Sequence, residues 1–288
     1  MTCDFDPSRI APAVPNTSLL DCGLVAIIAA SILDSDFSNL RGEIEEVDRA
    51  GVDMFSLDVM DGHFAPRITF GDYVVACVRT WTSLPIEAHL MIQSPERWVE
   101  RFIDVGADLV LFHLEATTVH RDVIAEIRGR NRSAGMAILA SPPVEQLFDW
   151  VPSVNVVNFL AVPVGFGGQQ SAPDTCQRIR ALRAVADHVN PNLVIEVDGG
   201  IKPENAEAYV AAGADMLTVG TGIYHAPNRM EAVRRLKTGT AGAADAIGRS
   251  RGSMFLQRRE RSHLDRARLS RRLRELSEEL GAPTENLL

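Results

Sequence analysis

The chain has 288 residues, of which 46% are hydrophobic and only 6% aromatic, so a large core can form and must be mostly aliphatic. The net charge of −9 argues against nucleic acid as a general partner. The four cysteines are scattered, which fits a reducing compartment, and no apolar run reaches the ~18 residues that a membrane helix needs. We therefore expect a cytoplasmic protein with no membrane partner.

The first 22 residues contain three prolines and little periodicity, so we expect residues 1–22 to form an irregular arm. The apolar stretch from Leu24 to Leu33 is short enough to resemble the core of a signal peptide. However, acidic Asp21 stands just before it and no positively charged segment leads into it, which argues against secretion.

Eight short apolar runs follow, and amphipathic stretches separate most of them. The runs are Val25–Ile28, Met54–Asp58, Ile86–Met91, Leu109–His113, Met136–Leu139, Val154–Leu160, Leu193–Val197 and Met216–Val219. The expected helices are Asn39–Ala50, Pro95–Val105, Asp122–Ala134, Thr175–Val189 and Asn205–Ala212. Alternating strands and helices predict parallel βαβ units, and eight of them predict a closed α/β TIM barrel, (β/α)8, over residues 23–238.

Near-copies of one turn support a repeated unit. Gly51, Gly106 and Gly213 each end an expected helix just before an apolar run, where glycine can adopt the left-handed conformation that stops a helix. Such turns also occur in α/β proteins of other kinds.

The charge balance changes from acidic to basic near Lys237, which predicts that residues 239–288 form an extension outside the barrel. Residues 239–252 are rich in Gly, Ala and Ser and predict a linker. Leu269, Leu273, Leu276 and Leu280 lie on one stripe of an expected C-terminal helix, 256–280. That helical extension could pack on its own barrel, dock on another subunit of a homo-oligomer, or offer a basic surface to an anionic partner.

Catalytic groups of parallel barrels lie where strands end. Ser31 lies shortly after the first run, in the segment Ala29–Leu33 that ends the first expected strand, and alone it is more typical of a helix cap or turn. Ser56 and Asp58 share one face of the second run, where Asp58 is either a buried carboxylate that needs a partner or the cap of a turn. Glu87, His89 and Met91 share a face of the third run, and a lone histidine there is more often structural.

Asp198 directly follows the seventh run. His113 ends the fourth run, and Glu115 lies two residues beyond it. Two aspartates and a histidine from three strands suit a divalent ion such as Zn, Mn, Fe or Mg. Two opposed carboxylates also suit a proton shuttle.

Glycine-rich loops follow the last three runs. They are Gly165-Phe166-Gly167-Gly168-Gln169, Asp198-Gly199-Gly200-Ile201 and Gly220-Thr221-Gly222. Their backbone amides can wrap an anion, and barrel enzymes often hold a phosphate after strands 7 and 8. The alternative is ordinary turn chemistry.

Taken together, these residues resemble the ribulose-phosphate 3-epimerase family between about Val25 and Tyr224. The strings DVMDGHF (58–64), HLM (89–91), GFGGQ (165–169) and EVDGG (196–200), with Ser31-Ile32-Leu33, carry the resemblance. It implies that Asp58 and Asp198 are acid/base groups at C3 of a ketose 5-phosphate, and that they hold a divalent cation (Zn, Fe, Mn, Co or Mg) together with His89.

The resemblance also implies how a small phosphorylated sugar is bound. Ser31 would hydrogen-bond it, His89 would lie near it, and Met60 and Met91 would crowd the reacting carbon. The phosphate would be held by the loops, at Gly165, Phe166, Gly167, Gly168, Gly199, Gly200, Gly220 and Thr221.

Departures from the family pattern gather at the same end of the barrel. Ser56 stands where the family has a metal-ligating histidine, which predicts weaker metal binding. Ala30 replaces a proline, Leu160 a methionine, Val164 a proline and Thr221 a serine. An epimerase is the favoured hypothesis, because both aspartates remain. An epimerase or isomerase of another phosphorylated sugar, and a degenerate sugar-phosphate-binding barrel with a regulatory tail, are the alternatives.

Overall fold

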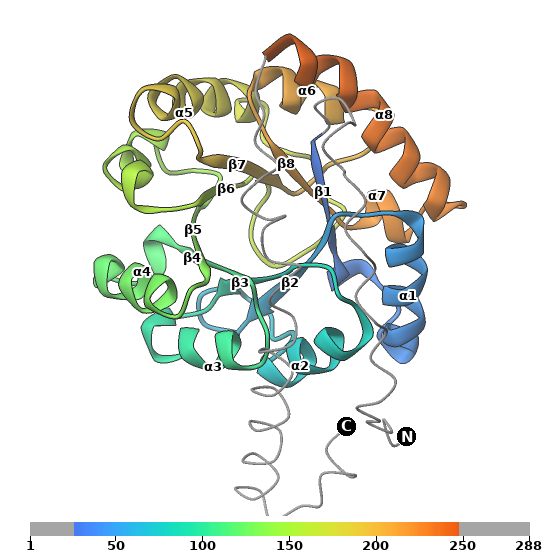
Figure 1. Cartoon of the computed structure of the whole chain (residues 1–288), viewed down its shortest axis with the longest axis horizontal. Helices are drawn as coiled ribbons and strands as arrows, with labels where there is room; N and C mark the ends of the chain where they lie inside the picture. The colour runs from blue at the N-terminus through green and yellow to red at the C-terminus, as the bar shows by residue number, and fades with distance from the viewer. Residues whose placement is uncertain (1–25, 248–288) are drawn as a thin grey trace, which may run out of the picture.

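A computed structural model describes residues 26–247 as a barrel of eight parallel strands (Figure 1). Each strand pairs with the next, and β8 closes the ring on β1 through pairs such as Ala29 with Thr218. The strands are β1 (Ile27–Ser31), β2 (Met54–Met60), β3 (Ile86–Met91), β4 (Leu109–His113), β5 (Ser133–Ile138), β6 (Val156–Leu160), β7 (Val194–Asp198) and β8 (Met216–Val219). The predicted TIM barrel is confirmed, and each of the eight expected runs overlaps a strand.

Helices surround the ring (Figure 1). They are α1 (Leu40–Ala50), α2 (Asp72–Trp81), α3 (Val99–Asp104), α4 (His120–Gly129), α5 (Thr175–Val189), α6 (Ala206–Ala212), α7 (Thr221–Tyr224) and α8 (Arg229–Ile247). Short 3₁₀ segments add η3 (Ile32–Asp34), η4 (Phe37–Asn39), η5 (Pro95–Arg97), η6 (Leu114–Ala116) and the longer η7 (Val144–Ser153). None of the helices within 26–247 is long and apolar enough to cross a membrane.

The expected helices are present, although the one expected over Pro95–Val105 divides into η5 and α3, and α2, α7, α8 and η7 were not among those expected. The helix expected over Asp122–Ala134 ends at Gly129, because β5 already begins at Ser133. No helix was expected at α2, because Val74, Val75 and Val78 are weak helix formers. Both α2 and η7 pack apolar side chains on the barrel, and this burial favours the helical form over local preference.

Glycines end two helices as predicted. Gly51 and Gly213 take left-handed backbone at the ends of α1 and α6, with φ of 92° and 115°. Gly106 also has a positive φ, of 110°, just before β4.

The barrel interior is built in layers. Apolar side chains fill the amino-terminal layer, and they are Ala29, Met54, Leu109, Leu111, Val156, Val194 and Met216. A polar layer lies above them, made of Ser56, Glu87, Asn158, Glu196 and Thr218, each at most 1% exposed. Because side chains alternate along a strand, the next inward positions on β2, β3 and β7 are Asp58, His89 and Asp198. The fold thus brings the three candidate ligands to one end of the barrel.

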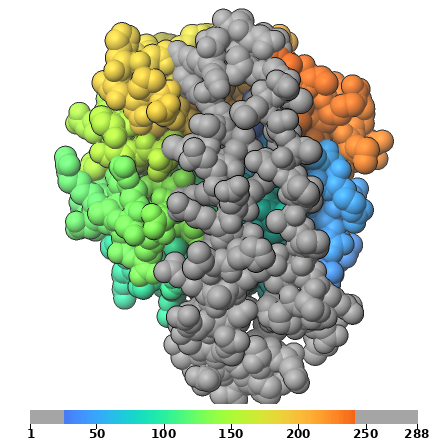
Figure 2. All heavy atoms as spheres, in the orientation of Figure 1, coloured from blue at the N-terminus to red at the C-terminus, as the bar shows by residue number. Residues whose placement is uncertain are grey.

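The last helix joins the end of the barrel to its beginning. Figure 2 shows the segment near residue 50 beside the segments near residues 225–240. Arg229, at the start of α8, lies 2.9 Å from Glu43 and 2.8 Å from Glu46 of α1, and Lys237 lies 2.8 Å from Asp53.

The linker predicted over 239–252 is wrong for its described part, since 239–247 continue α8. Alanine is the strongest helix former, and Ala241, Ala243, Ala244 and Ala246 outweigh the two glycines of this segment, Gly239 and Gly242. Thr240 is fully buried, and its hydroxyl donates to the carbonyl of Leu236 at 2.9 Å. The arm, residues 1–22, and the leucine-striped helix, 256–280, lie outside the described residues.

We predict that a chain ending at Ile247 keeps the thermal midpoint of the full chain, whereas one ending at Lys237 stays folded with a midpoint lower by a few degrees. The shorter chain loses the buried Thr240, and about 1 kcal/mol corresponds to roughly 2–4 °C in a domain of this size. Thermal melts of the three chains decide this. An unfolded product from the chain ending at Ile247 would show that residues 248–288 complete the core.

Candidate active site

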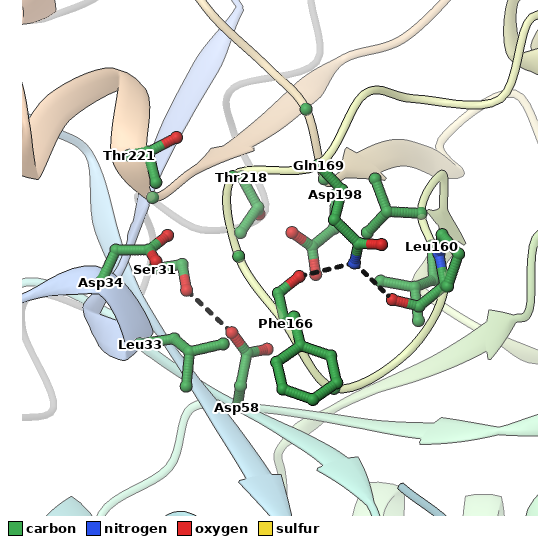
Figure 3. A pocket seen from close by; sticks show the side chains of 18 of the residues that line it. Ser31, Leu33, Asp34, Asp58, Leu160, Phe166, Gln169, Asp198, Thr218 and Thr221 are labelled. Atoms are coloured by element: carbon green, nitrogen blue, oxygen red, sulfur yellow. Dashed lines mark hydrogen bonds between the residues drawn. The ribbon is translucent and has the colours of Figure 1, made fainter. Parts of the chain in front are cut away.

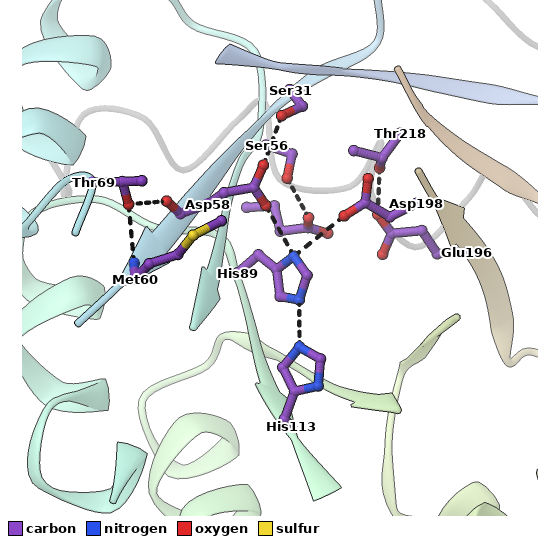
Figure 4. A network of polar contacts seen from close by, with 11 residues as sticks. Ser31, Ser56, Asp58, Met60, Thr69, His89, His113, Glu196, Asp198 and Thr218 are labelled. Atoms are coloured by element: carbon purple, nitrogen blue, oxygen red, sulfur yellow. Dashed lines mark hydrogen bonds and ion pairs between the residues drawn. The ribbon is translucent and has the colours of Figure 1, made fainter. Parts of the chain in front are cut away.

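Four side chains meet at the carboxyl end of the barrel, one each from β1, β2, β3 and β7 (Figure 4). Ser31 Oγ donates to Asp58 Oδ2 at 2.8 Å. His89 Nδ1 lies 3.0 Å from Asp58 Oδ1 and 3.4 Å from Asp198 Oδ2. The predicted grouping of two aspartates around one histidine is therefore found, and Asp58 does not serve as a turn cap with its side chain.

Burial and the two carboxylates act in opposite directions on His89. Burial lowers the pKa of the imidazole, but the hydrogen bonds and charges of Asp198 and Asp58 outweigh it and hold that pKa well above its usual value. Burial, with the nearby charge of Asp58, raises the pKa of Asp198 to about 6. The space between the carboxylates therefore favours a positive charge.

The donor set fits a divalent cation. Asp58, His89 and Asp198 each offer one ligand atom, and these atoms lie within 4.8 Å of one another. Two carboxylate oxygens and one imidazole nitrogen suit Zn, Fe, Mn or Co, and a less oxygen-rich site of this kind suits Mg less well.

His113, the last residue of β4, contacts His89 from the neighbouring strand, and the sequence did not reveal this contact. The two Nε2 atoms are 2.9 Å apart and the rings are stacked (Figure 4). Burial lowers the pKa of His113 to about 4, so this ring is neutral, and its Nε2 accepts the proton of His89 Nε2. That arrangement leaves His89 Nδ1 facing the aspartates, as a metal ligand requires.

Ser56 belongs to the polar layer and not to the cluster. Its hydroxyl donates to Glu87 Oε1 at 2.7 Å, and across the barrel Thr218 donates to Glu196. Burial raises the pKa of Glu87, with a further contribution from Glu196, and raises that of Glu196 to about 7. Glu87 therefore satisfies Ser56 with one oxygen, and the other is buried with no hydrogen-bond partner.

A pocket lies above these groups at the carboxyl end of the barrel, and its space, counted together with the solvent at its open mouth, is about 510 Å³ (Figure 3). Met60, Met91, Leu160 and Val162 form an apolar cluster at its wall. All predicted site residues line this pocket except His89, which is fully buried below it; they are Ser31, Asp58, Met60, Met91, Gly165, Phe166, Gly167, Gly168, Asp198, Gly199, Gly200, Gly220 and Thr221. Asp34, which was not among the predicted site residues, also lines the pocket.

The glycine loops on the opposite wall pack closely on one another. Gly200 has a φ of 74°, and a Cβ there would lie 2.6 Å from the nitrogen of Ser171 and 2.9 Å from the carbonyl oxygen of Gln169. The Gln169 side chain donates to the carbonyls of Pro163 and Phe166 at 2.8 and 2.7 Å, which fixes the loop between them. Glycine at position 200 is therefore required by both conformation and space.

Comparison with known proteins identifies the family. The profile of the "Ribulose-phosphate 3 epimerase family" matches residues 27–224. The chain belongs to this family. It is 40% identical over 210 residues to a "Ribulose-phosphate 3-epimerase" of Synechocystis, covering 72% of this chain and 91% of that protein. It is 36% identical to the Bacillus subtilis protein of the same name, covering 73% of this chain and 97% of that one.

Solved structures at lower identity share the fold. KGPDC from Streptococcus mutans is 14% identical, with a TM-score of 0.56 over 76% of this chain and 99% of its own. 3-Hexulose-6-phosphate synthase from Salmonella typhimurium is 15% identical, with a TM-score of 0.56 over 75% and 99%. At these identities the likeness concerns the barrel alone.

We predict that Gly200→Ala lowers the free energy of unfolding by about 1–3 kcal/mol, because the methyl group meets two backbone atoms and the φ is unfavourable for alanine. Gly129→Ala is the matched control, since it lies at the end of α4 with no atom within 4 Å of the added methyl, and it should be neutral or slightly stabilising. Urea unfolding measures both. Equal midpoints for the two variants would contradict the assignment.

Proposed function

We propose that this epimerase-family chain interconverts D-ribulose 5-phosphate and D-xylulose 5-phosphate by proton transfer at C3. The observation that carries the proposal is the pair of aspartates, Asp58 and Asp198, held around His89 on the floor of the pocket. The names of the two relatives described above support this pair of sugars.

In the proposed mechanism, one aspartate removes the C3 proton and the other returns a proton to the opposite face of the planar enediolate. Efficient proton transfer needs each group in its correct protonation state, and here the surroundings of the two differ. Asp58 accepts the Ser31 hydroxyl, whereas burial raises the pKa of Asp198. Both carboxylates are held by neighbouring side chains, so the proton transfers are effectively intramolecular once the sugar is bound.

Asp58, His89 and Asp198 are the proposed holders of a divalent cation. Such an ion acts as a Lewis acid toward the substrate oxygens. His113 accepts from His89 Nε2 and so orients the ligand nitrogen. Only three protein ligands are available in the described cluster, because Ser56 is bound to Glu87.

The rest of the proposed substrate site divides between polar and apolar contacts. Ser31 binds the sugar, and Met60 and Met91 restrict the reacting carbon. The backbone of Gly165 to Gly168, Gly199, Gly200, Gly220 and Thr221 holds the phosphate. The positive φ values of Gly165, Gly168, Gly199 and Gly200, between 73° and 115°, support this part of the proposal because they let successive amides turn toward one point.

We predict that Asp58→Asn and Asp198→Asn each lower kcat by at least about 10² while the fold survives, because an amide cannot exchange the C3 proton. A coupled epimerase assay measures the rates, and circular dichroism checks the fold. Asp122→Asn, an exposed change on α4, is the control and should leave the rate unchanged. Near-normal rates in both site variants would overturn the two-base mechanism.

We predict that the protein loses its metal readily to a chelator and that Ser56→His tightens binding by about tenfold or more, equivalent to about 1.4 kcal/mol. The imidazole adds a metal ligand at a position where the serine hydroxyl is already bonded to Glu87. Metal content after dialysis and titration with Zn²⁺ measure the affinity.

Ser56→Ala is the control for this experiment, because it also breaks the bond to Glu87 but adds no ligand. If Ser56→His binds metal no more tightly than Ser56→Ala, the three-ligand interpretation is wrong. Activity that persists without any bound metal would contradict the role of the cation.

A further inference from the structure

One carboxylate at the pocket wall has no part in the proposed mechanism. Asp34 is the last residue of η3, the short turn that follows β1, and its side chain reaches the glycine loops (Figure 3). A Cβ placed on Gly167 would overlap Asp34 Oδ1, and one placed on Gly220 would overlap Asp34 Oδ2. The carboxylate therefore lies between the loop after β6 and the loop after β8.

The contacts of Asp34 are those of an anion. The backbone amide of Thr221 donates a hydrogen bond to the carboxylate, and the nearby charges of His225 and Arg67 lower the pKa of Asp34. Burial and the charge of Asp58 oppose ionisation and leave the pKa of Asp34 above its usual value. Within the described residues, no cationic side chain forms a salt bridge with Asp34, and the backbone amide of Thr221 is its hydrogen-bond donor.

We propose that Asp34 determines affinity for the phosphate, because its carboxylate occupies the space between Gly167 and Gly220 and competes with the substrate's phosphate for the backbone amides there. This inference rests on the proposed function, which assigns these loops to the phosphate. A dianionic phosphate and a carboxylate cannot share one set of amide donors without strong repulsion. The side chain must turn out of the subsite before a ketose phosphate binds.

Asp34 should therefore weaken binding of the substrate's phosphate and leave the proton transfer at C3 unaffected. The unmodified protein should bind free phosphate weakly and show a raised KM for its substrate. Removing the charge should lower KM, with kcat little changed, since Asp34 does not contact the aspartate–histidine cluster through any hydrogen bond in the described structure. A residue that merely shapes the turn would not separate KM from kcat in this way.

Inorganic phosphate is the probe for the experiment, and isothermal titration is the measurement. Asp34→Asn keeps the size of the side chain and removes the charge, whereas Asp34→Ser also empties the space. Both should bind phosphate at least about tenfold more tightly than the unmodified protein. Asp36→Asn is the matched control: it removes one negative charge two residues away, on an exposed side chain that caps η4, and asparagine caps equally well. Its phosphate affinity should be unchanged.

Unchanged or weaker phosphate binding in both Asp34 variants would overturn the inference. Weaker binding would show instead that Asp34 contributes a hydrogen bond to the phosphate. A gain shared equally by Asp36→Asn would also overturn it, since the effect would then be one of net charge. Epimerase activity of the same samples tests the proposed function independently of the role of Asp34. If the Asp34 variants bind phosphate tightly but no ketose phosphate is turned over, the proposed function is contradicted and the inferred role of Asp34 is not.

Discussion

The site depends on one electrostatic constraint: Asp58 and Asp198 can be buried together only with a positive charge between them. Their oxygens lie 3.0 and 3.4 Å from the same nitrogen of His89, in surroundings that exclude most water. Two buried carboxylates without such a charge would repel each other and neutralise by taking up a proton. A cation, whether imidazolium or metal ion, therefore holds these two carboxylates in place.

The surrounding structure satisfies that constraint from several sides. On the neighbouring strand, His113 accepts a hydrogen bond from the other nitrogen of His89. Below the cluster, Ser56 donates to Glu87 and Thr218 donates to Glu196. Above, the glycine loops and apolar side chains form a pocket whose polar groups converge from different strands. Because the eight strands form a closed ring, these positions are fixed relative to one another without any flexible connection.

The barrel could be predicted from sequence because its strands are short apolar runs separated by turn residues and helices, a local and repeated pattern. The candidate residues could be predicted for a related reason: a parallel barrel brings every strand end to the same rim. Ser31, Asp58, His89 and Asp198 were found in this way, and the structure brings them together.

Features set by contacts between distant residues could not be predicted. The bond from Ser56 to Glu87, the pairing of His89 with His113 and the position of Asp34 between two loops depend on side-chain orientation across the barrel. Local composition was misleading at 239–247, where alanine content and the burial of Thr240 give helix in place of the expected linker. Asp34 directly follows the Ser31–Leu33 segment, but its local sequence does not show that its carboxylate lies between Gly167 and Gly220 of two distant loops.

The most direct test of the two-base account is the fate of the C3 hydrogen during a single turnover in D₂O. If Asp58 and Asp198 act from opposite faces, the proton that one removes is not the proton that the other delivers. Product isolated at low conversion should then carry solvent deuterium at C3 in nearly every molecule, when either epimer is the starting sugar. Product that retains the substrate's own C3 hydrogen in most turnovers would contradict the account, because it would require one group to remove and return the same proton.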